Sequence, residues 1–232
     1  MHPRFELFGA QHLAVLALTV AAAAALSALA RRHREDRVGH VLRASLAALM
    51  LAGVAGYVIA EARTREVRLV ELLPLHLCDA AIFVGVYALL TRRPLACELL
   101  YFWALAGSTL AMVTPEVWYA LPDWRTAVFF LMHGLTVTAA IVLTFGYGCR
   151  PRPRAAWRAF ALTVAYAAVV AGIAVALDAN FLYLRAKPAT PTLLDHFGPW
   201  PWYIVTAAAI GLVLFLLLEL PFRARGRPEG AS

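Results

Sequence analysis

Long apolar stretches separated by short polar segments run through the whole sequence. A helix needs about 20 apolar residues to cross the hydrocarbon core. The segments between the stretches are short, and the first stretch is too long for a typical signal-peptide core and lacks a basic start. The pattern predicts an all-α, polytopic membrane protein, a single domain over residues 1–232 in which seven transmembrane helices form one bundle. The expected spans are residues 9–30, 41–60, 72–90, 96–113, 127–148, 157–177 and 200–220.

Composition and the distribution of basic residues add an orientation. The chain is 62% hydrophobic and 15% charged, whereas a soluble domain carries far more charge. Of the 21 Lys and Arg residues, 14 lie after spans one, three, five and seven, and seven lie on the opposite side. The positive-inside rule therefore places the C-terminus in the cytoplasm and the N-terminus outside. The basic residues are spread over four separate segments, which argues against a nucleic-acid partner.

Polar and ionisable residues from several predicted spans share one depth, near the outer surface. Such residues are rare in hydrocarbon and usually face the bundle interior or a wet cavity. The cytoplasmic halves of the same spans are interpreted as almost purely apolar. The pattern favours one polar site that opens outward. Its members are Gln11, His12, Glu61, His76, Cys78, Asp79, Thr114, Glu116, His133, Asp178 and Asn180.

The stretch LPLHLCD, residues 73–79, holds the most reactive side chain of this layer. A helical repeat of about 100° per residue puts His76 and Asp79 on one face, with Cys78 about 160° from His76. Cys78 therefore needs a partner from another helix, and His133 in FFLMHG has suitable chemistry and depth. Imidazole can take the thiol proton, and the thiolate can attack an ester carbonyl to give a thioester.

Structural interpretations apply to the other members. A cysteine in a membrane helix is more often a packing residue, and Cys97 and Cys149, at the cytoplasmic ends of spans four and five, are interpreted that way. Cys78 lies too far from either to form a disulfide. Asp79 is expected to pair structurally with His76. Ordinary interface roles are expected for Gln11, His12 and Glu61.

Four motifs occur in order: LPLHLCDAAIF (73–83), YFWALAGSTLAMVTPE (101–116), FFLMHG (129–134), and NFLYLRAKP with LLDHFGPWPWY (180–203). Together they resemble the YwaF-type bacterial integral membrane family, which has an animal counterpart in a transmembrane acyltransferase of ether phospholipids. The Cys–His pair of that relative corresponds to Cys78 and His133. The resemblance implies acyl transfer from a phospholipid to a lysophospholipid through an acyl-enzyme, in a multi-pass protein of the bacterial inner membrane.

The expected enzyme is thus a lipid transacylase or acyl hydrolase that needs no cofactor or metal. Cys78 is the nucleophile and His133 the general base and acid. His76, Asp79 and Glu116 are expected to orient the catalytic residues or to contact the lipid headgroup. Asn180 is expected to donate a hydrogen bond to the oxyanion. Arg185 and Lys187 are expected to bind lipid phosphate or to anchor the loop at the membrane interface.

Two other interpretations stay open at this stage. The same polar site could serve a non-enzymatic bundle that binds or transports a lipid or a small solute. His76 and His133 could also act as the axial ligands of a haem.

Overall fold

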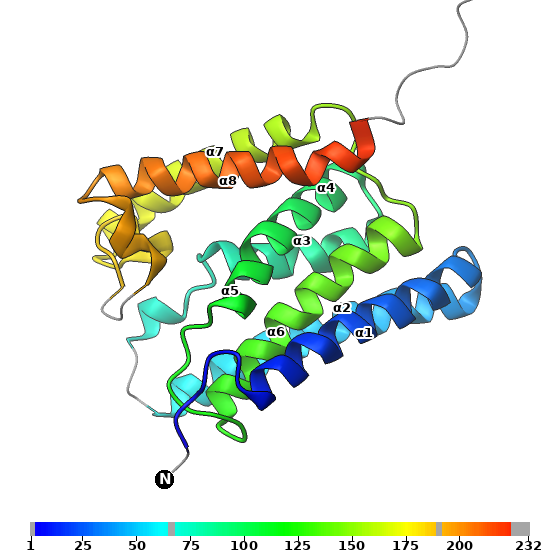
Figure 1. The fold of residues 1–232 in the computed structure, drawn as a ribbon, viewed down its shortest axis with the longest axis horizontal. Coiled ribbons are helices and arrows are strands. Elements are labelled where there is room, and N and C mark those ends of the chain that lie inside the picture. The colour runs from blue at the N-terminus through cyan, green and yellow to red at the C-terminus, as the bar shows by residue number, and fades with distance from the viewer. Residues whose placement is uncertain (1–2, 65–67, 189–191, 224–232) are drawn as a thin grey trace, which may run out of the picture. The chain divides into compact units, whose positions relative to one another are not determined.

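The computed structural model describes residues 3–64, 68–188 and 192–223, and this part of the chain is helical, with no strand (Figure 1). The predicted all-α membrane fold is confirmed. Contacts divide the chain into two compact units, Met1–Cys149 and Arg150–Ser232, called unit 1 and unit 2 below. The placement of the two units relative to each other is not determined. Arg65, Arg225 and Arg227, which contribute to the predicted orientation, lie outside the described residues.

Unit 1 carries most of the helices. They are α1 (Ala10–Arg32), α2 (Arg37–Thr64), the 3-10 helix η1 (Leu69–Leu72), α3 (Leu77–Thr91), α4 (Pro94–Phe102), the π-helix η2 (Trp103–Ser108), α5 (Thr109–Val113), α6 (Trp124–Ile141) and the π-helix η3 (Val142–Gly146). Unit 2 holds α7 (Ala155–Ala176), the 3-10 helices η4 (Phe181–Tyr183) and η5 (Leu193–Phe197), and α8 (Trp202–Arg223).

In the described ranges, six helical stretches are long and apolar enough to cross a membrane, and they match six of the predicted spans. The third predicted span, 72–90, contains the shorter helix α3 of 15 residues. At 1.5 Å per residue α3 is about 22 Å long, less than the hydrocarbon core of about 30 Å. The beginning of α3 therefore lies below one membrane surface if its end reaches the other.

Helix α6 is the central helix of unit 1, since it packs against α1, α2, α3 and α4. Figure 1 shows α1 and α2 running alongside it. Glycines permit the close approach: a Cβ on Gly134 of α6 would lie 3.1 Å from Thr19 Oγ1, and one on Gly53 of α2 would lie 2.1 Å from Met132 Sδ. Small residues at helix contacts are the usual means of tight packing in membranes. They hold in place the part of α6 that carries His133.

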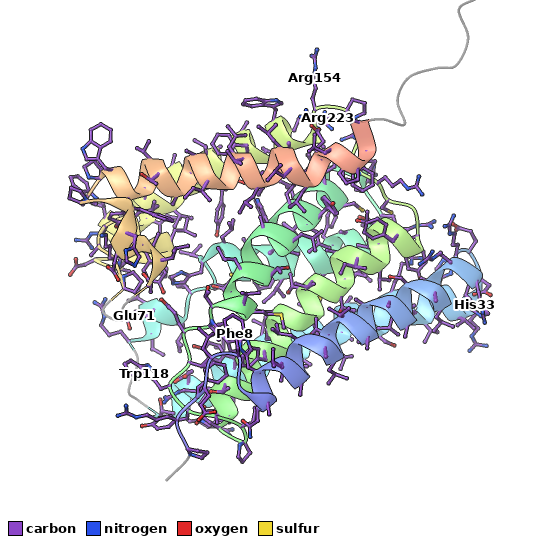
Figure 2. All side chains as sticks on the ribbon, in the orientation of Figure 1. Phe8, His33, Glu71, Trp118, Arg154 and Arg223 are labelled. Atoms are coloured by element: carbon purple, nitrogen blue, oxygen red, sulfur yellow. The ribbon has the colours of Figure 1, made fainter. Side chains whose placement is uncertain are left out.

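The two ends of unit 1 are built differently. Figure 2 places Phe8 and Trp118 at one end, called the outer end after the predicted orientation, and His33 at the other, called the inner end. At the outer end the N-terminal segment pairs with the loop before α6: the Phe5 N–H donates to the Trp118 carbonyl at 3.1 Å. The inner end contains the short turn between α1 and α2.

The expectation of almost purely apolar inner halves is wrong at two positions. Arg43 in α2 is 6% exposed and Glu98 in α4 is 1% exposed. The Arg43 guanidinium donates to the Leu89 carbonyl near the end of α3 at 2.8 Å and lies over the Tyr147 ring. A cation is favourable beside the carbonyl end of a helix, which gives this buried arginine a structural role.

Gly39 supplies a test of the inner turn. A Cβ on this residue of α2 would lie 1.7 Å from the His33 carbonyl oxygen, whereas a Cβ on Gly56 of the same helix would meet nothing within 4 Å. We expect Gly39→Ala to lower the free energy of unfolding by about 2 kcal/mol or more, because the turn must shift. Gly56→Ala should raise it by about 0.5–1 kcal/mol, because alanine favours helix. Thermal unfolding in detergent, followed by circular dichroism, measures both, and equal effects would contradict the tight turn.

Candidate functional site

Cys78 is the second residue of α3 and is half-buried. The residue before the helix, His76, has extended backbone with ψ 154°, so the prediction that His76 and Asp79 share a helical face is wrong. Instead, the His76 N–H donates to Asp79 Oδ2 at 3.1 Å. A carboxylate in the first turn satisfies a free N–H and complements the helix dipole. Asp79 therefore has the structural role expected for it, through the backbone of His76.

His133 lies in α6 with one ring nitrogen engaged. Its Nδ1 is 2.8 Å from the Phe129 carbonyl oxygen, and its ring lies 4.2 Å, centroid to centroid, from the Phe129 ring. A carbonyl oxygen can only accept a hydrogen bond, so Nδ1 carries the proton of the neutral imidazole. Nε2 is then the nitrogen with a lone pair, and the fixed tautomer is the one that a general base requires.

The inner ends of α3 and of the α6–η3 helix are tied to adjacent residues of the α1–α2 turn. Arg92, directly after α3, binds both carboxylate oxygens of Glu35 at 2.6 and 2.9 Å. Arg34 Nε donates to the carbonyl of Gly146, the last residue of η3, at 2.9 Å. Because Arg34 and Glu35 are neighbours, one short turn binds the inner ends of both helices.

Cys78 and His133 lie the same number of residues from these inner ends. Cys78 stands thirteen residues before Thr91, the last residue of α3, and His133 stands thirteen residues before Gly146. At 1.5 Å per residue of α-helix, each lies about 20 Å along its helix from that end, slightly less for His133 because the π-helix η3 is more compact along its axis. Helices α3 and α6 pack against each other. The common depth of the two side chains stays a prediction, with which these equal residue counts are consistent.

No hydrogen bond joins Cys78 to His133 within the part of the chain that the structure describes. Catalytic hydrogen bonds are often long in unliganded enzymes and tighten when substrate binds. The structure thus holds a thiol and an imidazole of defined tautomer on two helices that pack against each other.

Glu61 forms a buried ion pair at the outer end. Arg125 Nε and Nη2 donate to its two carboxylate oxygens at 2.7 and 3.0 Å, and the Glu61 side chain is 4% exposed. The pair joins the end of α2 to the beginning of α6. The structural role expected for Glu61 agrees with these contacts.

We expect Glu61→Gln to lower the free energy of unfolding by about 1 kcal/mol, because the buried Glu61 side loses two charge-assisted hydrogen bonds while the half-exposed Arg125 can turn to solvent. The matched control is Glu71→Gln, which breaks an ion pair to Arg68 that is exposed on both sides. Exposed pairs contribute about 0–1 kcal/mol. Thermal unfolding of the two variants in the same detergent checks the difference, and similar midpoints would argue against the buried pair.

His12 is 1% exposed and both of its ring nitrogens are bonded. Nδ1 accepts from the Phe8 N–H at 2.9 Å, and Nε2 donates to the Met112 carbonyl at 2.8 Å. This ring fastens α1 to α5 and has no nitrogen left for chemistry, so its expected structural role agrees with the structure. Glu116 is exposed in the loop between α5 and α6.

The remaining candidates belong to unit 2 and organise its loop after α7. The Asn180 amide donates to the Ala186 carbonyl at 2.7 Å, and Arg185 pairs with Asp178 at 2.8 Å. Lys187 lies 3.9 Å from an Asp195 carboxylate oxygen. Their predicted roles toward an oxyanion or a lipid phosphate stay predictions, since the position of unit 2 relative to Cys78 is not determined.

A pocket of about 560 Å³ opens between α3 and α4, with a lining that is apolar apart from Arg93 and includes neither Cys78 nor His133. No group of three or more His, Cys, Asp or Glu side chains arranged to hold a metal occurs within residues 3–64, 68–188 and 192–223.

Comparison with known proteins gives a family. A model described as the TMEM164 family matches residues 7–219, nearly the whole chain. An uncharacterized protein of Treponema pallidum (strain Nichols) is 29% identical over 230 residues, which cover 94% of this chain and 90% of the relative. No solved structure matches the chain. The narrower YwaF-type resemblance stays a prediction.

Proposed function

The chain belongs to the TMEM164 family, and from this premise we propose that it is an integral membrane acyltransferase. The proposed reaction moves a fatty acyl chain from a phospholipid to a lysophospholipid through a thioester on Cys78. His133 acts as general base and acid. The proposed location is the bacterial inner membrane, with the site toward the outer leaflet.

The observation that carries the proposal is the matching position of a cysteine and a histidine along two packed helices, α3 and α6. The Phe129 carbonyl adds a second support, because its bond to Nδ1 leaves the Nε2 lone pair of His133 as the proton acceptor. A level about 20 Å from the inner end is about 10 Å below the outer boundary of a core about 30 Å thick. Phospholipid ester groups lie near that boundary, so in this proposal the donor lipid moves about 10 Å into the bundle to reach Cys78.

The first half-reaction acylates the enzyme. His133 Nε2 takes the thiol proton of Cys78, and the thiolate sulfur attacks the ester carbonyl carbon of the donor lipid. The tetrahedral intermediate collapses with cleavage of the ester C–O bond. The leaving alkoxide takes the proton from the imidazolium and departs as a lysophospholipid, and Cys78 is left as a thioester.

The second half-reaction runs the same steps with another alcohol. The hydroxyl of the acceptor lysophospholipid gives its proton to Nε2 and attacks the thioester carbonyl carbon. Cleavage of the C–S bond releases the Cys78 thiolate, which recovers its proton from His133. In the same proposal the unit 1 residues His76 and Glu116 contact the lipid headgroup.

The test uses purified full-length protein in liposomes. The vesicles hold a diacyl phospholipid with an isotopically heavy acyl chain and a lysophospholipid with a different headgroup. We expect the heavy chain to appear on the acceptor, together with a hydroxylamine-labile acyl adduct on the peptide that contains Cys78. Protein-free vesicles are the background.

Three outcomes would overturn the proposal in different ways. Release of the heavy chain only as free fatty acid would indicate a hydrolase. Saturable lipid binding without turnover, equal in wild type and Cys78→Ala, would indicate a binding or transport bundle. A Soret absorption band in the purified protein that is lost in both His76→Ala and His133→Ala would favour the haem interpretation.

A further inference from the structure

Two cysteines that are far apart in sequence meet at the inner end of unit 1. Cys97 lies in the first turn of α4 and is 3% exposed, whereas Cys149 follows η3 and is half-buried. Helix α4 packs against η3, Cys149 packs against the core cluster that contains Cys97, and the two thiols lie within reach of a side-chain hydrogen bond. Both cysteines are predicted from the sequence to be packing residues, and only the fold brings them together.

Backbone hydrogen bonds hold both residues in place. The Cys97 N–H donates to the Arg93 carbonyl at 3.1 Å, and the Cys149 N–H donates to the Leu143 carbonyl at 2.9 Å. Two thiols within hydrogen-bond reach on anchored backbones are the starting arrangement for a disulfide, which would bring their Cβ atoms to about 3.5–4.5 Å. The pair is therefore poised for a covalent bond without a change of fold.

The surrounding charges make the two thiols unequal. Arg92 and Arg43 are the cations that act on Cys149, and Glu35, which holds Arg92, is the opposing anion. The hydrogen bond from Cys97, together with these arginines, lowers the pKa of Cys149 below that of a free thiol. Cys149 is thus the more acidic and the more exposed of the two thiols, and Cys97 is the buried thiol beside it. This division matches a reactive and a resolving cysteine.

We propose that Cys97 and Cys149 form a redox-reactive pair, in which a hydroperoxide oxidises Cys149 and Cys97 resolves the product as an intramolecular disulfide. The Cys149 thiolate attacks one peroxide oxygen, the O–O bond breaks, and the leaving hydroxide takes a proton to become water. The Cys97 sulfur then attacks the Cys149 sulfenic acid and the S–O bond breaks. The proton of Cys97 leaves with the hydroxide as a second water. The two sulfurs lose two electrons, and hydrogen peroxide is reduced to two waters.

The disulfide would fasten the first turn of α4 to the segment directly after η3, and η3 continues the helix that carries His133. The predicted orientation puts the pair at the cytoplasmic ends of two spans, and disulfides on the cytoplasmic side are transient and typically sense oxidants. The proposal is independent of acyl transfer, since neither cysteine takes part in that reaction.

The experiment treats full-length protein in detergent with hydrogen peroxide and follows it by intact mass and peptide mapping. We expect a loss of two hydrogens, a Cys97–Cys149 cross-linked peptide, and recovery of both thiols with dithiothreitol. In Cys97→Ser, Cys149 should stop at a sulfenic acid that dimedone traps. In Cys149→Ser, Cys97 should stay unmodified. Cys78→Ser is the matched control and should form the same cross-link as wild type.

Several results would overturn the proposal that Cys97 and Cys149 form a redox-reactive pair. These are a cross-link absent from peroxide-treated protein that keeps its helical spectrum, a sulfinic acid on Cys149 without any cross-link, or a disulfide between two chains on a non-reducing gel. Cys97→Ala, which adds no polar atom to the core, repeats the test if Cys97→Ser does not fold. Dimedone labelling of Cys149 in that variant is expected, and its absence would also overturn the proposal.

Discussion

Replacing Cys78 with alanine is expected to lower acyl transfer by about 10³-fold or more, because the covalent route loses its nucleophile. The half-buried side chain is small and lies in the first turn of α3, so the helix itself should tolerate the change. Cys78→Ser tests the chemistry more narrowly. A serine hydroxyl is far harder to deprotonate than a thiol, so this variant should also fail, and any adduct on it would be an ester that resists hydroxylamine.

The control for Cys78→Ala is Cys149→Ser, which removes another half-buried thiol of unit 1. Under reducing conditions it should transfer acyl chains like wild type. Labelled acceptor lipid is measured by mass spectrometry, and thermal unfolding verifies that each variant is folded. Retention of transfer in folded Cys78→Ala would remove Cys78 from the reaction and the thioester with it.

The long spans could be predicted from sequence because an apolar stretch of about 20 residues has few other uses. The short α3 could not, since residues 72–90 are as apolar as the other stretches. The signals for its late start are local: Pro74 restricts the chain before the helix, and Asp79 satisfies the His76 N–H as the first turn begins. The residues HLCD can be seen in the sequence, but the capping of α3 by Asp79 depends on the extended backbone of His76.

The buried charges of the inner half mark a second limit. Glu98 stands alone in the apolar run PLACELLYFWAL, and an ionisable residue in such a run is itself a signal that it is buried and bonded. Arg43 gave a weaker signal, because an arginine near a cytoplasmic end usually reaches solvent. Its bond to the Leu89 carbonyl depends on the packing of α2 against α3.

The candidate site likewise combines residues that the sequence could predict with contacts that it could not. Cys78 and His133 could be predicted as candidate residues from residue type and expected depth. The bonds of Arg34 and Glu35 at the inner ends of α6–η3 and α3 could not, because they join positions about 60 to 110 residues apart. The meeting of Cys97 with Cys149 is likewise tertiary. The sequence of a membrane protein thus predicts which reactive side chains are present and roughly how deep they lie. It does not predict which residues pair across helices.

His133→Gln is expected to lower the turnover rate for acyl transfer by about 10²–10⁴-fold, the usual contribution of a general base and acid. Glutamine can still donate to the Phe129 carbonyl, so the local hydrogen bond can be kept while the basic Nε2 is lost. The effect should fall on kcat with little change in KM, because the residue moves a proton and is not proposed to bind lipid. Added imidazole should restore part of the rate in the smaller variant His133→Gly.

The control is His40→Gln, an exposed histidine at the inner end whose ring bonds only within its own turn. It should leave transfer unchanged. Transfer assays at saturating and limiting lipid separate kcat from KM, and thermal unfolding reports folding. Since glutamine cannot accept and return the thiol proton, undiminished kcat in folded His133→Gln would leave Cys78 without a base. The acyl-enzyme would then need a proton acceptor from another helix, and the matched depth of α3 and α6 would be a matter of packing alone.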